Sequence, residues 1–424
     1  MSLKRFLCNG SNKNRDSYVW NMIGSILMAF QSVILLMVLR RTMDLAVAGV
    51  FSIAYANSNL FLTVGKFGMR NFQVSDIEQQ FTFSEYKCSR WISTIAMMVI
   101  VCIYVFVVSF KNGYTFEKAM IIIWMCLYKA VDSIEDVYCG EYQRRDRLDI
   151  GAKSLTLRVF VTMIIFVIAV VITRSLLISL IVSTLATALI AIVLIKMTVG
   201  EFCENYVTLL NKKRVLKLLW LCLPLFLGAF LSFYIGNAPK YSIDAILSDE
   251  IQACYGFIAM PVFVIGLLNN FIFNPLIFRL SSLWNENKIE SFIKRIFIQS
   301  IVVCIITLVC IGAASICGIP VLSWLYNTDL SAYKQELLIM LLGGGFLGMS
   351  GLLNIVITIM RGQRLLMTGY IVTALMAILF SDMVVERDGV MGATVFYTIL
   401  MCVLSIAFFA IFIYGIVKKK KRFN

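Results

Sequence analysis

Residues 17–64 read SYVWNMIGSILMAFQSVILLMVLRRTMDLAVAGVFSIAYANSNLFLTV, and the fold class follows from this stretch. Two apolar runs, 17–39 and 45–64, contain no charged side chain, and the segment Arg40-Arg41-Thr42-Met43-Asp44 separates them. A helix of about 20 apolar residues is long enough to cross the hydrocarbon core of a bilayer. The stretch therefore predicts two membrane-spanning helices whose connection lies on one face of the membrane.

A similar arrangement returns in the second half of the chain. An apolar run beginning at Leu218 leads into Pro239-Lys240-Tyr241-Ser242-Ile243-Asp244, and another apolar run follows. In both halves a cation, three residues and an aspartate follow the first run. We interpret this echo as an internal duplication, with chance similarity between apolar helices as the alternative. Duplicated halves in transporters enclose the substrate path between them.

The composition indicates a polytopic membrane protein. Of 424 residues, 60% are hydrophobic and 15% are charged, whereas soluble proteins carry about 25% charged residues. The formal charge of +14 comes from cations in short connections between apolar runs, which favours contact with lipid head groups over nucleic acid. The chain has 12 cysteines, no CxxC pair and no histidine, so we expect neither a metal site nor a cofactor.

The expected fold is an all-α integral membrane protein with 12 transmembrane helices in two six-helix halves around a central cavity. The N-terminal bundle would comprise residues 1–199, a cytoplasmic linker 200–217, and the C-terminal bundle 218–424. The predicted spans are 17–39, 45–64, 91–110, 117–138, 155–173, 175–195, 218–238, 251–276, 293–317, 335–359, 365–384 and 391–417.

Lysine and arginine alternate in number along the chain. When cations at helix ends are counted with the adjoining connection, the N-terminus, the C-terminal tail and every second connection hold two to five, and the others hold one or two. Cations are retained on the cytoplasmic side of membranes. The alternation therefore predicts that both termini are cytoplasmic.

The short connections exclude several functions. No connection exceeds about 30 residues, which leaves no room for a nucleotide-binding domain. Gly343, Gly345 and Gly348 fit GxGxxG, but they lie inside an apolar span without a preceding strand, so close helix packing is the expected role. Without a catalytic constellation, we predict that the protein is not an enzyme.

Charged residues inside the fourth span are the first candidate site. Lys129, Asp132, Glu135 and Asp136 lie at offsets that share one helix face. Charge is costly inside a bilayer, and ionisable residues there usually face partners or a watery interior. One hypothesis is a site for substrate contact by Lys129 and ion coupling by the carboxylates. The other is a pair of internal salt bridges plus an interfacial helix end, since Arg144, Arg145 and Arg147 follow closely.

The hairpin charges are the second candidate site. Arg40, Arg41 and Lys240 either anchor helix ends or line a cavity shared by the two halves, with Asp44 and Asp244 as candidates for ion coupling. Guanidinium groups bind phosphate oxygens in a bidentate fork, so a cavity with these cations would suit a diphosphate.

Several segments resemble one known family, the bacterial flippases that export O-antigen or capsule repeat units. The resemblance rests mainly on the first 160 residues, and its segments are Ala48-Gly49-Val50-Phe51-Ser52-Ile53-Ala54, Gly65-Lys66-Phe67-Gly68-Met69-Arg70-Asn71-Phe72-Gln73-Val74-Ser75-Asp76, Asp132-Ser133-Ile134-Glu135-Asp136-Val137-Tyr138, Tyr142-Gln143 and Arg147-Leu148-Asp149. This family is a branch of the multidrug, oligosaccharidyl-lipid and polysaccharide (MOP) exporter superfamily.

The resemblance implies a substrate and a location. An undecaprenyl-diphosphate-linked oligosaccharide would pass from the cytoplasmic to the outer leaflet of the bacterial inner membrane by alternating access. Arg70, at the FGxR-like position, would join the cavity cations. The partners would be this glycolipid, the bilayer, a polysaccharide polymerase and other assembly proteins, and no nucleic acid. The alternatives are a multidrug or cation antiporter of the same superfamily, and a non-transporting scaffold of a sugar-assembly complex.

Overall fold

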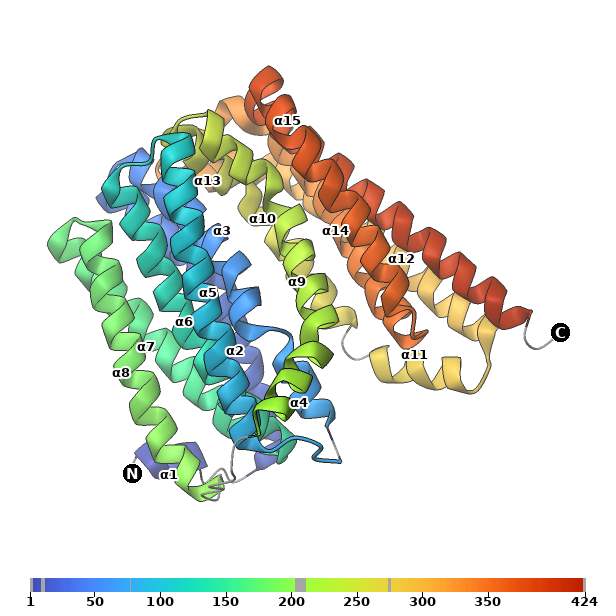
Figure 1. Ribbon diagram of the computed structural model, residues 1–424. Coiled ribbons are helices and arrows are strands. Elements are labelled where there is room, and N and C mark those ends of the chain that lie inside the picture. The colour runs from blue at the N-terminus through green and yellow to red at the C-terminus, as the bar shows by residue number, and fades with distance from the viewer. Residues whose placement is uncertain (1–2, 9–11, 77, 203–210, 274–275, 422–424) are drawn as a thin grey trace. The chain divides into compact units, whose positions relative to one another are not determined.

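The computed structural model describes residues 3–8, 12–76, 78–202, 211–273 and 276–421, and every regular element within these ranges is a helix (Figure 1). The chain divides into two compact units, Met1–Phe230 and Leu231–Asn424, and the division falls inside α9. Part of the linker predicted at 200–217 lies outside the described residues. The predicted domain limits therefore stay a prediction.

The first unit contains α1 to α8 and the start of α9. Their bounds are α1 (Leu3–Cys8), α2 (Lys13–Thr42), α3 (Leu45–Lys66), α4 (Met69–Ser75), α5 (Phe83–Asn112), α6 (Phe116–Arg144), α7 (Leu148–Thr173), α8 (Leu176–Phe202) and α9 (Lys212–Ile246). Helix α6 is the central element, since it packs against α3, α4, α5, α7 and α8. Its charged face is consequently surrounded by other helices and not by lipid.

The second unit contains the end of α9 and the remaining helices. Their bounds are α10 (Asp249–Phe273), α11 (Leu276–Asn285), α12 (Ile289–Ala313), the π-helix η1 (Ala314–Gly318), α13 (Ile319–Tyr326), the 3-10 helix η2 (Ser331–Tyr333), α14 (Lys334–Ile359) and α15 (Gln363–Lys420). Helix α14 is central here and packs against α10, α11, α12 and α15. In Figure 1, α11 runs at a steep angle to α12 and α14.

The glycines of α14 allow this packing. A Cβ atom on Gly343 would lie 2.7 Å from the Tyr397 ring, and one on Gly345 would lie 2.5 Å from Thr307. The GxGxxG pattern therefore serves the close helix packing expected of it.

Ten of the described helices are long and apolar enough to cross a membrane. Helix α6 is not among them because of its charges, and α15 covers two of the predicted spans, 365–384 and 391–417. The two arms of α15 meet at Gly389, whose φ of 58° and ψ of −133° are not helical. An all-helical membrane protein is thus confirmed, while the number 12 and the cytoplasmic position of the termini stay predictions.

The repeated cation-and-aspartate segments of the two halves lie at different places relative to their helix ends. Helix α2 ends at Thr42 and Asp44 is the N-cap residue of α3, whereas α9 continues through Lys240 and Asp244 to Ile246. The predicted end of this helix near residue 238 was therefore wrong. Burial explains the continuation, because Ile243 is 0% exposed and the Ser242 hydroxyl donates a hydrogen bond to Asp382 Oδ1 at 2.6 Å.

Candidate functional site

A sharp break between α3 and α4 places Arg70 against α6. Phe67 and Gly68 have φ values of 49° and 62°, in the left-handed region that favours glycine. Gly68 also passes close to α9, where an added Cβ atom would lie 2.6 Å from that of Leu225. The Phe67 ring stacks on Phe226 with centroids 4.6 Å apart. The Phe-Gly-x-Arg segment therefore turns the chain so that Arg70 faces back onto α6.

Asp136 of α6 gathers three cations. Arg90 Nη2 lies 2.9 Å from its carboxylate, Arg70 Nη1 lies 3.4 Å away, and Lys66 Nζ lies 3.9 Å away. Arg90 also donates to the Gly65 carbonyl oxygen at 2.9 Å. The Arg90 side chain is 1% exposed, but those of Arg70 and Lys66 are 31% and 37% exposed. The group thus has one buried cation and two at an accessible edge.

Arg158 of α7 joins the other two carboxylates of α6. Its guanidinium lies 2.6 Å from Asp132 Oδ1 and 2.8 Å from Glu135 Oε2, and its Nη1 donates to Thr187 Oγ1 at 2.7 Å. Lys129 Nζ donates to the second carboxylate oxygen of Asp132 at 3.2 Å. Two cations and two carboxylates are therefore buried together, with their charges balanced.

Aromatic side chains complete the environment of Lys129. Its ammonium lies 5.1 Å from the ring centroid of Tyr55 and 5.8 Å from that of Tyr128, within the range of cation–π attraction. The Tyr128 hydroxyl accepts a hydrogen bond from Gln31 Nε2 at 2.8 Å. Lys129 is 2% exposed. This geometry favours a positioning role over direct contact with a large substrate.

Asp132, Glu135 and Asp136 of α6 form internal salt bridges, and sequence reasoning missed their partners on other helices. Their main buried partners are Arg90 and Arg158, whereas Arg144 and Arg145, which follow α6's charged face in sequence, pair with Glu141. Arg158 lies within the predicted span 155–173, yet it was counted with the preceding connection. An arginine inside a predicted apolar span was the sequence feature that indicated a buried pair.

The charges of the first hairpin lie at the end of α2. Arg40 is half-buried, and Arg41 and Asp44 are exposed. Both arginines are in the last turn of α2, where cations interact favourably with the helix dipole. Their placement fits the anchoring hypothesis, and their role at a cavity stays a prediction.

Lys240 lines a cavity of about 340 Å³ inside the second unit. The polar side chains around it are Ser232 and Asn237 of α9, Tyr255 of α10 and Tyr397 of α15. Asp244, one helical turn from Lys240, is 8% exposed. Of the predicted cavity cations, Lys240 is thus in a cavity within one unit, whereas Arg70 lies at the edge of the buried network in the other.

Comparison with known proteins identifies the fold. No family model and no curated protein matches the sequence. Among solved structures, the lipid II flippase MurJ in an inward closed conformation aligns with a TM-score of 0.68 at 12% identity, covering 94% of this chain and 89% of that one. The chain has the MATE and MurJ fold.

Two further solved structures support this statement. An inward-facing multidrug resistance MATE transporter of the MOP superfamily aligns with a TM-score of 0.62 at 12% identity, covering 97% of this chain and 99% of that one. The eukaryotic MATE transporter AtDTX14 aligns with a TM-score of 0.63 at 12% identity, covering 96% and 99%. These neighbours are transporters and a flippase.

Proposed function

We propose that this protein is a flippase that carries undecaprenyl-diphosphate-linked oligosaccharide repeat units from the cytoplasmic to the outer leaflet of a bacterial inner membrane. The observation that carries the proposal is the fold shared with a lipid II flippase over 94% of the chain. The resemblance of the first 160 residues to O-antigen and capsule flippases supports the oligosaccharide substrate. A polysaccharide polymerase and other assembly proteins would then use the translocated unit.

The charge pattern of the first unit supports an anionic substrate. The buried carboxylates Asp132, Glu135 and Asp136 are matched by equally buried cations, and Lys66 and Arg70 remain at the accessible edge as surplus positive charge. A diphosphate would be stabilised there by charge-assisted hydrogen bonds, which are stronger than those between neutral groups. Arg40, Arg41 and Lys240 are the further cations that would meet it along its path.

The MATE neighbours favour a second candidate, an antiporter of cationic or drug-like compounds. Such a substrate would require accessible carboxylates. Asp132, Glu135 and Asp136 are at most 7% exposed, and each has at least one arginine partner. The accessible charge at this site is instead cationic, which favours the flippase.

The test is transport in liposomes. The full chain would be reconstituted with a labelled undecaprenyl-diphosphate-linked oligosaccharide, and the label reaching the opposite leaflet would be measured with a membrane-impermeant reagent. The double variant Lys66→Gln/Arg70→Gln should slow flipping about tenfold or more, because hydrogen bonds to charged groups are worth about 1.5–3 kcal/mol. The control Lys87→Gln/Lys111→Gln removes two exposed charges of the same unit and should flip normally.

Three results would contradict the proposal. If the wild-type protein moves no glycolipid, the remaining interpretation is a non-transporting scaffold. Transport of organic cations without glycolipid transport would favour the antiporter. Equal loss in both double variants would mean that net charge, and not this site, matters. A parallel variant, Arg40→Gln/Arg41→Gln/Lys240→Gln, tests the hairpin cations, and normal flipping would confine the site to Lys66 and Arg70.

A further inference from the structure

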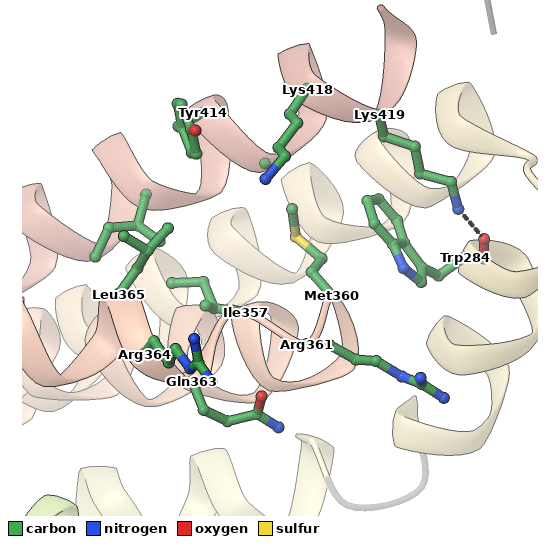
Figure 2. A pocket seen from close by; sticks show the side chains of 13 residues that line it. Trp284, Ile357, Met360, Arg361, Gln363, Arg364, Leu365, Tyr414, Lys418 and Lys419 are labelled. Carbon is green, nitrogen blue, oxygen red and sulfur yellow. Dashed lines mark hydrogen bonds between the residues drawn. The ribbon is translucent and has the colours of Figure 1, made fainter. Parts of the chain in front are cut away.

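A second basic site lies entirely within the second unit, and none of the residues assigned to transport above lines it. A cavity of about 570 Å³ opens where α11, the turn between α14 and α15, and the end of α15 meet (Figure 2). Arg361 and Arg364 come from the turn, and Lys418 and Lys419 come from the last turns of α15. None of the residues that line the cavity is acidic.

These cations are available to a ligand. Within the described residues, Arg361, Arg364 and Lys418 form no ion pair with a carboxylate, and Arg361 and Arg364 are exposed. Lys419 is held differently, since its ammonium lies 3.8 Å from the centroid of the Trp284 ring and donates to the Trp284 carbonyl oxygen. Figure 2 shows Lys418 and Lys419 reaching from α15 toward Met360 and Trp284.

Two features of the surroundings indicate the depth of a membrane head group. Helix α11 is amphipathic, with Leu276, Leu280 and Leu283 on one side and Arg279 and Ser282 on another, and it runs at a steep angle to the long helices (Figure 1). Helices of this kind lie in the membrane interface. Tryptophan is likewise enriched there, and Trp284 of α11 forms part of the cavity wall.

The rim of the cavity is continuous with an apolar surface. Leu365 and Tyr414 line the cavity and are 38% and 54% exposed, and the neighbouring Ile413 and Val417 on α15 are each 46% exposed. A ligand with a charged head and an apolar body would place both parts favourably. A small free anion would use only the cations, so this continuity favours a lipid.

We propose that this cavity binds the phosphate-bearing head group of an anionic membrane phospholipid, with the acyl chains lying along the exposed face of α15. Arg361, Arg364 and Lys418 would bind the phosphate oxygens, and Lys419 would hold Trp284 in place as part of the wall. Basic pockets between transmembrane helices bind head groups of this class. The proposal is independent of which substrate the protein transports.

The three segments that form the cavity also share a predicted membrane side. The connection containing α11, the turn with Arg361 and Arg364, and the C-terminal tail were all placed on the cytoplasmic side by the distribution of lysine and arginine. Because all three segments line one cavity, they must lie on the same side of the membrane, as that prediction requires. The bound lipid would accordingly belong to the cytoplasmic leaflet.

Native mass spectrometry of the full chain in detergent tests the proposal. Phosphatidylglycerol would be titrated against the wild type, and zwitterionic phosphatidylcholine would serve as the comparison lipid. Each cation near a lipid surface is worth about 1 kcal/mol, so Arg361→Gln/Arg364→Gln should weaken phosphatidylglycerol binding about 30-fold. The control Lys334→Gln/Arg387→Gln removes two exposed cations of the same unit that lie outside the cavity and should bind normally.

Several outcomes would overturn the proposal. If Arg361→Gln/Arg364→Gln binds phosphatidylglycerol as well as the wild type does, or if the control variant loses as much binding, the lipid does not bind in this cavity. Displacement of the lipid by millimolar inorganic phosphate as readily as by glycerophosphoglycerol would assign the cavity to a free anion. Preference for a diphosphate-linked polyprenol over phosphatidylglycerol, lost in the same variant, would make it a substrate site. Lys418→Gln alone gives a milder second variant if the double variant folds poorly.

Discussion

Replacing Arg158 with methionine would remove the cation that two buried carboxylates share. The Arg158 side chain is 0% exposed and lies 2.6 Å from Asp132 and 2.8 Å from Glu135. Removing one partner of a buried ion pair costs about 3–5 kcal/mol, because the other partner remains charged and desolvated. Methionine has a similar length, so little of the loss would come from an empty cavity. We therefore expect Arg158→Met to reduce the free energy of unfolding by about 3–5 kcal/mol.

A second substitution tests whether charge balance is the cause. In Arg158→Met/Glu135→Gln the remaining buried pair is Lys129 with Asp132, and the four positions again sum to zero charge. Contacting residues in one network typically show interaction energies of about 0.5–3 kcal/mol. The double variant should therefore recover about 2 kcal/mol of the loss. Equilibrium unfolding of the purified protein in mixed micelles with increasing sodium dodecyl sulfate would give both values.

This reasoning has clear points of failure. A loss below about 1 kcal/mol for Arg158→Met would mean that water or movement of neighbouring helices compensates the carboxylates. If Glu135→Gln added to the loss instead of reducing it, the cost would come from missing hydrogen bonds and packing and not from unbalanced charge. Arg174→Met, at an exposed cation after α7, controls for a general effect of removing arginine and should unfold as the wild type does.

Two further predictions concern the second unit. Gly345→Leu should lower the free energy of unfolding by about 1–3 kcal/mol, because the new side chain would meet Thr307. The control Gly351→Leu points into open space and should be neutral. Thermal unfolding compares the two variants, and equal melting temperatures would contradict the packing argument. Ser242→Ala removes the hydrogen bond to Asp382 and should cost about 1.5–3 kcal/mol in the same assay, and a value near zero would show that water replaces the hydroxyl.

The apolar runs were sufficient to predict the class of protein and the approximate position of most helices, because membrane spans need a minimum apolar length. They were not sufficient where tertiary contacts extend a helix. Helix α9 continues to Ile246 because Ile243 and Ser242 are buried and the Ser242 hydroxyl donates a hydrogen bond to Asp382 of α15, and no feature of the local sequence predicts that burial. The charges of α6 made that helix look less apolar than its neighbours although it is central to its unit.

The charged face of α6 could be predicted from the spacing of its residues, but its partners on other helices could not. Offsets along one helix show that Lys129, Asp132, Glu135 and Asp136 share a face, since helical periodicity is local. Arg90 and Arg158 come from α5 and α7, and only the packing of those helices brings them to α6. Arg144 and Arg145, which follow this face in the sequence, pair with a different carboxylate, Glu141.

The first unit keeps its paired buried charges apart from the surplus cations Lys66 and Arg70, and this arrangement lets the unit stay stable while it binds an anion. If the substrate contacted Arg158 or Arg90, each binding event would disturb an ion pair that is costly to break in a buried environment. Lys66 and Arg70 share Asp136 with Arg90 at longer distances of 3.9 and 3.4 Å, and both are partly exposed. A phosphate could therefore recruit these two cations while Arg90 alone continues to neutralise Asp136, so the helix packing would persist through binding and release.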